Sequence, residues 1–342
     1  MSSLRVGVIG CGSIAIKRHL PEYLANPRAT LAAVCDSVPG RAEQAARDFG
    51  APLAFADYRD VLARADVDAV SVCLPNHLHA QVALAAFAAG KHVLCEKPMA
   101  ASVAQARAMV DAAEAAGRVL MVGHNQRFMR VHQVAKQLVH SGQLGAVLRF
   151  ATTFAHGGPE GWSIDGADSW FFRRQEAVFG ALGDLGVHKA DLLRWLLEDE
   201  VASVAAVTTT IEKHGDVEDN AVCLVRMTSG ALGTIAASWT QHGGEDNSTH
   251  LYCEHGVVHI GSDPGYPLVV RREDGSVERR SLEAMSTNDH QAASGVIDEF
   301  VDAVLSGREP AVNGRAGAAA LAVIAAAAES SRTGRTVVPE PL

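Results

Sequence analysis

Short apolar runs alternate with amphipathic stretches over the first third of the chain. The apolar runs cover residues 4–9, 30–36, 66–75, 91–98 and 118–125, and the stretches between them, about 13–25, 41–50, 77–90 and 102–117, have helical patterns. Apolar runs of this length, bounded by turn residues, are typical of strands buried on both faces. Strands that alternate with helices indicate a parallel sheet with right-handed crossovers. We therefore predict a doubly wound α/β Rossmann domain over residues 1–123.

The pattern changes after residue 124. Following a predicted helix at 127–140, β-like runs succeed one another at 147–156, 201–213, 220–241, 250–260 and 267–282. Ser229-Gly230 and Asp274-Gly275 are typical of hairpin turns. A helix at about 183–197 interrupts the series, and two more helices, at about 289–306 and 315–332, end the chain. These runs predict an α+β domain over residues 124–342 with a large, mostly antiparallel open sheet.

The balance of helices and strands in this second domain also bears on assembly. So few helices would leave one face of the sheet uncovered, and apolar faces of that size usually form interfaces. We therefore expect a homodimer or homotetramer that assembles through the C-terminal sheet.

Composition narrows the classes of function. The chain has 342 residues, a formal net charge of −9 and 48% hydrophobic residues, which fits a globular protein with a sizeable core and argues against disorder. An acidic chain without a basic run is a poor binder of nucleic acid or anionic membranes. We find no signal-like leader and no apolar segment of membrane-spanning length, so we expect a cytoplasmic protein. Six cysteines without CxxC spacing and histidines without an HExxH motif lead us to expect no metal.

A glycine-rich turn follows the first predicted strand. Residues 10–15 read Gly-Cys-Gly-Ser-Ile-Ala and fit the GxGxxG/A pattern of a dinucleotide site. Gly10 permits the tight turn, Gly12 lets the backbone approach a pyrophosphate, and Ser13 and Ile14 open the helix whose N-terminus attracts phosphates. Asp36 ends the second strand, where a carboxylate binds the adenine ribose and repels a 2′-phosphate. The pattern predicts NAD, and Arg41 nearby leaves NADP as the less favoured cofactor.

Candidate catalytic residues stand at two places. Lys97 follows the strand at 91–98 at its carboxyl end, where open α/β sheets bind ligands, although a solvated loop lysine is the alternative. Asp184 and His188 are four residues apart and share a face of the predicted helix. A carboxylate beside an imidazole raises its basicity, which suits a base that removes an alcohol proton, although a surface salt pair has the same spacing. Glycines at 180, 183 and 186 suggest that this helix approaches something closely.

Three further segments carry a family resemblance. LPNHLH (74–79), CEKPMA (95–100) and GALGDLGVHKADLLRWLL (180–197), together with the turn GCGSIA, resemble the glucose–fructose oxidoreductase / inositol dehydrogenase / MocA family over essentially the whole chain. The resemblance implies that Lys97 is catalytic, that His188 is the acid/base and that Asp184 is its partner. It also implies nicotinamide-side cofactor contacts, and a pocket lined by the crossover segment. The cofactor contacts would come from Pro75, Asn76, His79, Glu96 and Lys97, and the crossover would contribute Gln126 and Arg127. For His79 a packing role is an open alternative.

Further substrate contacts are predicted in a loop rich in glycine and aromatic residues, HGGPEGWSIDGADSW (156–170). His156 and Trp162 are the leading candidates there, beside Asp165 and Trp170. Indole faces stack on the C–H surfaces of sugars, and polar groups hold hydroxyls. A surface loop with two packing tryptophans is the alternative.

Together these features predict an NAD-dependent oxidoreductase of CH–OH groups. It would oxidise a secondary hydroxyl of a cyclic polyol or sugar, of inositol, pyranose or anhydro-sugar type, to the ketone. His188 would take the hydroxyl proton, Lys97 would polarise the oxygen, and Lys97, Asp184 and His188 would also contact the substrate. One alternative is an NADPH-dependent reductase of a keto-sugar or anhydro-sugar. Another is a non-catalytic NAD-binding sugar sensor or regulator.

Overall fold

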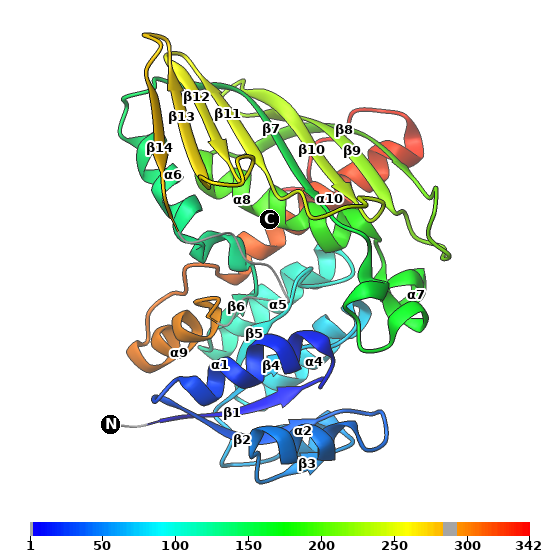
Figure 1. Ribbon diagram of the computed structural model, residues 1–342. Coiled ribbons are helices and arrows are strands. Elements are labelled where there is room, and N and C mark those ends of the chain that lie inside the picture. Colours follow the sequence, from blue (N-terminus) through cyan, green and yellow to red (C-terminus); the bar gives the residue numbers. More distant parts are fainter. Residues whose placement is uncertain (1–2, 283–292) are drawn as a thin grey trace.

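A parallel sheet forms the N-terminal part of the computed structural model, which describes residues 3–282 and 293–342 (Figure 1). The strand order is β3-β2-β1-β4-β5-β6, and all paired neighbours run parallel. The predicted Rossmann fold is therefore confirmed. The strands are β1 (Leu4–Ile9), β2 (Ala29–Cys35), β3 (Ala54–Phe55), β4 (Ala69–Val72), β5 (His92–Cys95) and β6 (Leu120–Val122).

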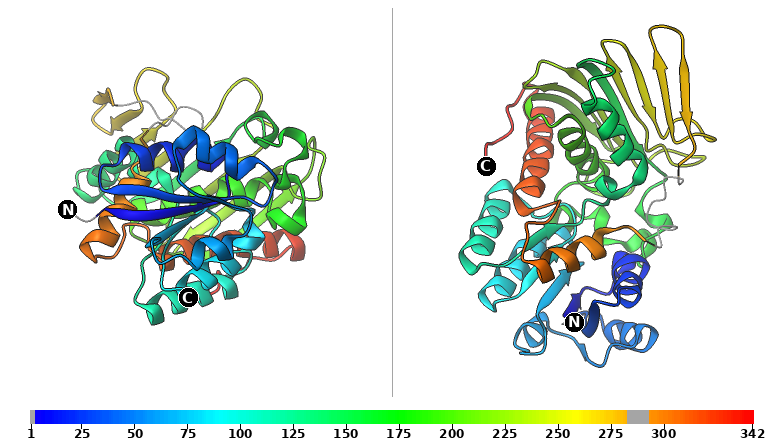
Figure 2. Two further views of the ribbon diagram at one scale, coloured as in Figure 1. Left: turned by 90° about the horizontal axis from the view of Figure 1, so that it is seen from below. Right: turned by 90° about the vertical axis from the view of Figure 1, so that its left-hand side faces the viewer.

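Helices cover both faces of this sheet, which explains the continuous apolar runs (Figure 2). Gly50 and Gly117 end two of them in left-handed conformation, as expected of C-terminal caps. The helices are α1 (Leu20–Ala25), α2 (Arg41–Phe49), α3 (Tyr58–Leu62), α4 (His79–Ala88) and α5 (Val103–Ala116). A 3₁₀ turn, η2 (Asn76–Leu78), precedes α4.

The chain returns to this sheet near its end. Helix α9 (Val296–Ser306) packs on β1 and α1, and its residues Val296, Ile297 and Phe300 are fully buried in the same cluster as Val6 and Val8 of β1. A single domain boundary at residue 124 would assign α9 to the second domain, although α9 packs on the first. The remainder of the predicted helix at 289–306 falls partly outside the described residues.

The second sheet has eight strands in the order β14-β13-β12-β11-β7-β10-β9-β8. Only the central pair β7 and β10 is parallel among the described pairs, so the predicted large, mostly antiparallel sheet is confirmed. Gly230 and Gly275 lie at φ +97° and +86° in the two predicted hairpin turns. The strands are β7 (Val147–Ala155), β8 (Val201–Thr209), β9 (Asn220–Met227), β10 (Leu232–Ser238), β11 (Thr249–Cys253), β12 (Gly256–Ile260), β13 (Leu268–Arg272) and β14 (Val277–Arg280).

Three helices pack on one face of this sheet, namely α6 (Arg130–His140), α8 (Val187–Leu197) and α10 (Gly314–Thr333) (Figure 2). Helix α10 also reaches the edge strand β8, where Ser330 Oγ accepts from Ala206 N and Ser331 Oγ accepts from Thr208 N, each at 2.9 Å. These bonds occupy backbone donors that an open edge would leave free.

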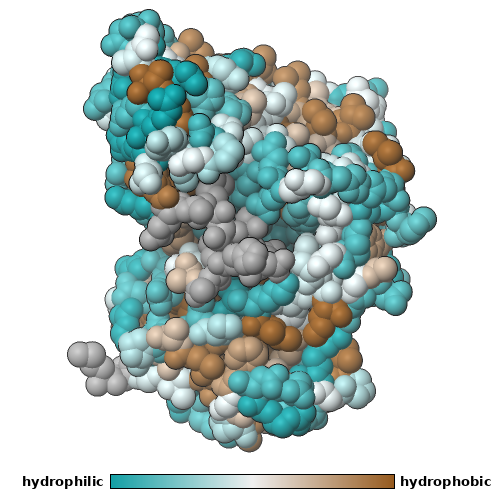
Figure 3. Space-filling model, in the orientation of Figure 1, coloured by the Kyte–Doolittle hydropathy of each residue, from teal (hydrophilic) through white to brown (hydrophobic). Residues whose placement is uncertain are grey.

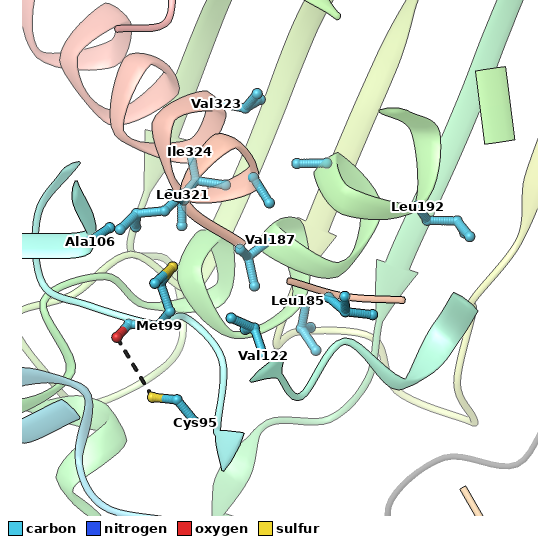
Figure 4. Close-up of a cluster of buried hydrophobic side chains, with 14 of the residues drawn as sticks. Cys95, Met99, Ala106, Val122, Leu185, Val187, Leu192, Leu321, Val323 and Ile324 are labelled. Atoms are coloured by element: carbon cyan, nitrogen blue, oxygen red, sulfur yellow. Dashed lines mark hydrogen bonds between the residues drawn. The ribbon is translucent and has the colours of Figure 1, made fainter. Parts of the chain in front are cut away.

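The two sheets meet in a shared apolar cluster (Figure 4). Val122 from β6, Val187 from α8, and Leu321 and Ile324 from α10 lie together there, all with less than 2% exposure. The junction is therefore a packed core, which holds the carboxyl ends of the first sheet against the start of α8.

Two predicted helices begin with a π-turn instead of an α-turn. The first is η1 (Ala15–His19), which precedes α1, and the second is η7 (Leu182–Gly186), which precedes α8. A π-turn inserts one extra residue per turn and is frequent at functional sites. The first lies beside the glycine-rich turn, and the second contains Asp184, which contacts Lys97. No helix among the described residues has the length and apolar character needed to cross a bilayer.

Candidate active site

The glycine-rich turn between β1 and η1 has the geometry that its sequence predicts. Gly10 lies at φ +93°, and a Cβ there would stand 2.2 Å from the carbonyl oxygen of Cys73. A Cβ on Gly12 would have no atom within 4 Å, so the backbone at this position faces open space. Gly10, Gly12, Ser13 and Ile14 all line one cleft. This is the cradle that a pyrophosphate requires.

Asp36 lies in the same cleft at the end of β2. Its two carboxylate oxygens accept backbone hydrogen bonds from Cys11 and Val38, each at 2.8 Å. These bonds hold the carboxylate beside the glycine-rich turn, in the position expected of a ribose-binding acid. The residues present thus fit a bound NAD.

Lys97 follows β5 and forms an ion pair with Asp184. Its Nζ lies 2.8 Å from both Oδ1 and the carbonyl oxygen of Asp184, which belongs to η7. Trp239 Nε1 donates to the second oxygen of Asp184 at 3.1 Å, and His156 Nε2 is 3.9 Å from it. Burial opposes ionisation of Asp184, but the charge of Lys97 and these neighbours hold its pKa below the usual range.

The predicted pairing of Asp184 with His188 is wrong. Among the described residues no hydrogen bond or ion pair joins these two side chains, because the carboxylate of Asp184 is turned to Lys97 and Trp239. Asp184 lies in the π-turn η7, whereas His188 lies in the following helix α8. Asp184 therefore orients Lys97 instead.

The glycines around η7 have a packing role. A Cβ on Gly180 would stand 1.9 Å from the carbonyl oxygen of Glu218, and one on Gly186 would lie 3.6 Å from Cβ of Ala237 in β10. The close approach that these glycines suggested is therefore to the second sheet and the residues just before it.

His188 is buried in the first turn of α8. Neither ring nitrogen has a hydrogen-bond partner among the described residues, and Nδ1 is out of contact with solvent. Its ring lies 5.7 Å from the rings of both His124 and Phe154. Burial and then the positive charge of Lys97 lower the pKa of His188 well below the usual value. A neutral imidazole with free nitrogens is equipped to accept a proton.

Glu96 lies directly before Lys97 and is buried against the first helix segment. Its Oε1 is 2.9 Å from Nε2 of His19, whose Nδ1 is 3.1 Å from the hydroxyl of Ser71. Burial disfavours the carboxylate, yet the bond to His19 and the charges of Arg18 and Lys97 bring the pKa of Glu96 down to about 2. Glu96 is thus an anion beneath Lys97, and it also lines the cleft.

The segment from the end of β4 to the start of α4 contributes Pro75, Asn76 and His79 to the cleft wall. Asn76 Nδ2 donates to the carbonyl oxygen of Ala177 at 2.8 Å, in the short helix α7 (Arg174–Ala177) of the second domain. Both ring nitrogens of His79 lie 2.8 Å from backbone carbonyl oxygens, those of Pro98 and Leu74. This geometry favours the packing alternative for His79.

The crossover segment after β6 forms a 3₁₀ turn, η3 (Asn125–Phe128). Its two predicted substrate contacts, Gln126 and Arg127, have different surroundings. Gln126 Nε2 donates to Oδ1 of Asn247, and Gln126 Oε1 is buried without a partner among the described residues. Arg127, however, forms a two-pronged pair with Asp191 of α8 at 2.7 and 2.5 Å and donates to Ala311 O. The guanidinium of Arg127 thus ties the crossover to α8, which argues against a substrate contact.

The loop after β7 lies across the cleft. We call residues 159–173 the covering segment; it holds three short 3₁₀ turns, η4 (Pro159–Gly161), η5 (Gly166–Asp168) and η6 (Trp170–Phe172). Ile164 N donates to Ser13 Oγ at 2.7 Å and Lys17 Nζ donates to Trp162 O at 3.3 Å. The second domain thus contacts the glycine-rich turn directly.

The aromatic residues of this loop do not all have the same neighbours. Trp162 lines the cleft, and its ring lies 6.5 Å from that of His156 and 5.0 Å from that of Phe171. Its Nε1 is buried without a partner among the described residues. Trp170 stacks on Phe171 at 3.9 Å. Asp165 lies away from the predicted sugar contacts, at Arg41 on the cofactor side.

Two residues of the site, His124 and Trp239, were not predicted from the sequence. His124 is buried beside His188 and has both ring nitrogens unpartnered within the described part of the chain. Trp239 at the end of β10 holds Asp184. His124 directly precedes η3, so its position in the predicted pocket-lining crossover could have identified it. No local sequence pattern identifies Trp239. Groups of three or more potential metal ligands are absent from the described residues.

Comparison with known proteins agrees with this geometry. Residues 4–124 match a family model described as "Oxidoreductase family, NAD-binding Rossmann fold", and residues 132–259 match the "GFO/IDH/MocA C-terminal domain". The chain belongs to the Gfo/Idh/MocA oxidoreductase family. The resemblance noted in the sequence is therefore confirmed, and the protein is an NAD-binding oxidoreductase of the CH–OH class.

Relatives of this Gfo/Idh/MocA protein differ in the substrates they are named for. A levoglucosan dehydrogenase of Pseudarthrobacter phenanthrenivorans is 32% identical over 71% of this chain and 69% of its own. A myo-inositol 2-dehydrogenase of Thermotoga maritima is 30% identical over 98% of both chains. A solved levoglucosan dehydrogenase in complex with NADH superimposes with a TM-score of 0.85 at 26% identity, with all of both chains covered.

Proposed function

We propose that this protein oxidises a secondary hydroxyl of a cyclic polyol, pyranose or anhydro-sugar to the ketone, with NAD as hydride acceptor. The observation that carries the proposal is the contact of Lys97 with Asp184 at the carboxyl end of β5, beside the unpartnered His188 and the glycine-rich cleft. Relatives named as levoglucosan and inositol dehydrogenases support the substrate class.

Each of these side chains has a separate task in the proposed reaction. His188 accepts the proton of the hydroxyl, because its imidazole is neutral at neutral pH. Lys97 donates a hydrogen bond to the same oxygen. Asp184 holds Lys97 in place, and Trp239 in turn holds Asp184. The nicotinamide supplies the redox chemistry when bound. Glu96 stabilises the positive charge of Lys97 from the side of the first sheet.

A ring with several hydroxyls suits the remaining polar atoms. Buried donors and acceptors without partners are uncommon in proteins and indicate a bound ligand or water. Among the described residues they include Nδ1 of His188, both ring nitrogens of the neighbouring His124, Oε1 of Gln126, Nδ2 of Asn247 and Nε1 of Trp162. His156, which lies near Asp184, can add a further contact. The indole of Trp162 offers an apolar face for sugar C–H groups.

A screen tests the proposal. The protein is mixed with NAD and a panel of inositols, aldoses and anhydro-sugars, and the absorbance of reduced nicotinamide is followed, with Lys97→Ala as the blank. We expect turnover with at least one member. The reverse arm offers NADPH or NADH with keto-sugars and anhydro-ketoses, since one relative is named 1,5-anhydro-D-fructose reductase. Turnover only in that arm would favour the reductase alternative. The absence of turnover in both arms would favour a non-catalytic NAD-binding sugar sensor.

Assembly into a homodimer or homotetramer through the second sheet is part of this proposal. The face of β8, β9 and β10 opposite α10 exposes Val207, Val222, Leu224 and Leu232, which are 45–71% exposed. Hydrophobic patches lie over β8 and β9 in Figure 3. An apolar face of this kind supports self-association. Light scattering on wild type and Leu224→Lys tests it, and a wild-type monomer at micromolar concentration would contradict it.

A further inference from the structure

Arg41 lies at the end of the cleft that Asp36 marks as the ribose site. It begins α2, and it lines the cleft together with Asp36, Ser37 and Val38. An arginine close to this position is the group that accommodates the 2′-phosphate of NADP in dinucleotide-binding folds. By its place in the fold, Arg41 could therefore admit NADP despite the carboxylate of Asp36.

The guanidinium of Arg41 is held by a residue of the other domain. Nη2 of Arg41 donates to Oδ1 of Asp165 at 2.7 Å, and the two side chains are 21% and 35% exposed. Asp165 belongs to the covering segment, which is fixed on the first domain by the bonds from Ile164 to Ser13 and from Lys17 to Trp162. Because the segment is anchored on the first domain directly before Asp165, the pair differs from an isolated ion pair between mobile side chains.

We propose that Asp165 is a specificity-determining residue that makes the cofactor site select NAD over NADP. The carboxylates of Asp36 and Asp165 line the cleft beside Arg41, and Lys17 and Arg173 line it as well. A 2′-phosphate carries nearly two negative charges at neutral pH. It would meet the like charge of Asp36 and would have to displace the carboxylate of Asp165 from Arg41. NAD has a neutral hydroxyl at that position and meets neither obstacle.

The proposal rests on the NAD-dependent function proposed above, but its test needs no sugar. If Asp165 only fastened the covering segment, its loss would weaken NADH and NADPH alike. If it discriminates, its loss changes the ratio of the two affinities. The ratio is therefore a readout that a merely structural role would not move.

The experiment compares Asp165→Asn with Asp168→Asn, using nicotinamide fluorescence to titrate NADH and NADPH. Asp168 is the matched control, because it belongs to the same segment and loses the same charge but does not line the cleft. We expect Asp165→Asn to raise NADPH affinity relative to NADH by about tenfold or more, because the freed guanidinium of Arg41 can pair with the 2′-phosphate. Asp168→Asn should leave the ratio unchanged. Asp165→Ala is a second variant that removes the same charge.

A double variant completes the test. Arg41→Gln has no guanidinium that the loss of Asp165 could free. Adding Asp165→Asn to Arg41→Gln should therefore shift the ratio of NADPH to NADH affinity much less than Asp165→Asn does alone. An unchanged ratio in both Asp165 variants would overturn the proposal, as would an equal shift in Asp168→Asn. An inactive sugar screen with the predicted shift in cofactor ratio would remove the proposed reaction and leave this inference standing.

Discussion

At the scale of single residues, local signals identified the side chains that stand at strand ends. Lys97 and Asp36 were predicted because parallel strands present their carboxyl ends to ligands, and both line the cleft. Arg127 was misjudged because its partner Asp191 lies 64 positions along the chain, and no local pattern reveals that pair. Residues that act locally are readable from sequence, whereas those that depend on a distant partner are not.

The depressed pKa of His188 leads to a prediction for the pH dependence of catalysis. Protonation removes the base, so kcat/KM falls as pH drops through the pKa of the imidazole. Since burial and Lys97 place that pKa below its usual 6.5, the rate should be on its plateau at neutral pH. Rate measurements across pH at saturating NAD should show a half-maximum below 6.5, and this limb should vanish in His188→Ala. A half-maximum above 6.5, or a limb that survives in His188→Ala, would speak against His188 as the base.

At the scale of elements, periodicity identified the strands and helices but not their interruptions. The residues around Asp184 were assigned to an ordinary helix because their apolar spacing fits one, and the single extra residue of η7 leaves little trace in that pattern. The glycine-rich turn was easier to predict, since its shape depends on neighbours in sequence.

The two glycines of that turn should respond differently to alanine. Gly10→Ala places a Cβ 2.2 Å from a backbone oxygen at a positive φ, so it should lower the melting temperature by several degrees as well as NADH affinity. Gly12→Ala has free space in the protein itself and should fold normally but bind NADH at least about tenfold more weakly, since its methyl group would occupy the pyrophosphate path. Calorimetry and NADH titration check both. Normal NADH binding by Gly12→Ala would place the pyrophosphate elsewhere.

At the scale of the whole molecule, the order of the two domains was predictable but their contacts were not. The return of α9 to the first sheet and the reach of the covering segment to Ser13 join segments more than 100 residues apart. Sequence patterns specify what each segment is and carry little information on such contacts. The same contacts build the cleft, so its cover could only be found in the structure.

Several buried histidines predict how stability depends on pH. Burial lowers the pKa of His132 to about 3 and also lowers those of His79 and His124. The unfolded chain takes up protons below about 6.5 while the folded chain does not, so stability falls as pH falls. Each such group can cost about 1.4 kcal/mol per pH unit in this range. Thermal unfolding should show a falling Tm from pH 6.5 towards 5.5, above the range where most carboxylates protonate. A constant Tm over this pH range would contradict the prediction. His132→Phe should make the fall of Tm with pH less steep.

The central claim is that the cleft beside Lys97 is a hydride-transfer site in which Lys97 acts on the substrate. Its most direct test is the turnover number of Lys97→Ala at saturating NAD and substrate, measured together with NADH affinity, with Lys136→Ala on the distant helix α6 as control. We predict that kcat falls by about 10²–10⁴-fold while NADH affinity changes little, because Lys97 lies outside the phosphate-binding turn. Near-normal kcat in Lys97→Ala, or a loss confined to NADH binding, would contradict the account.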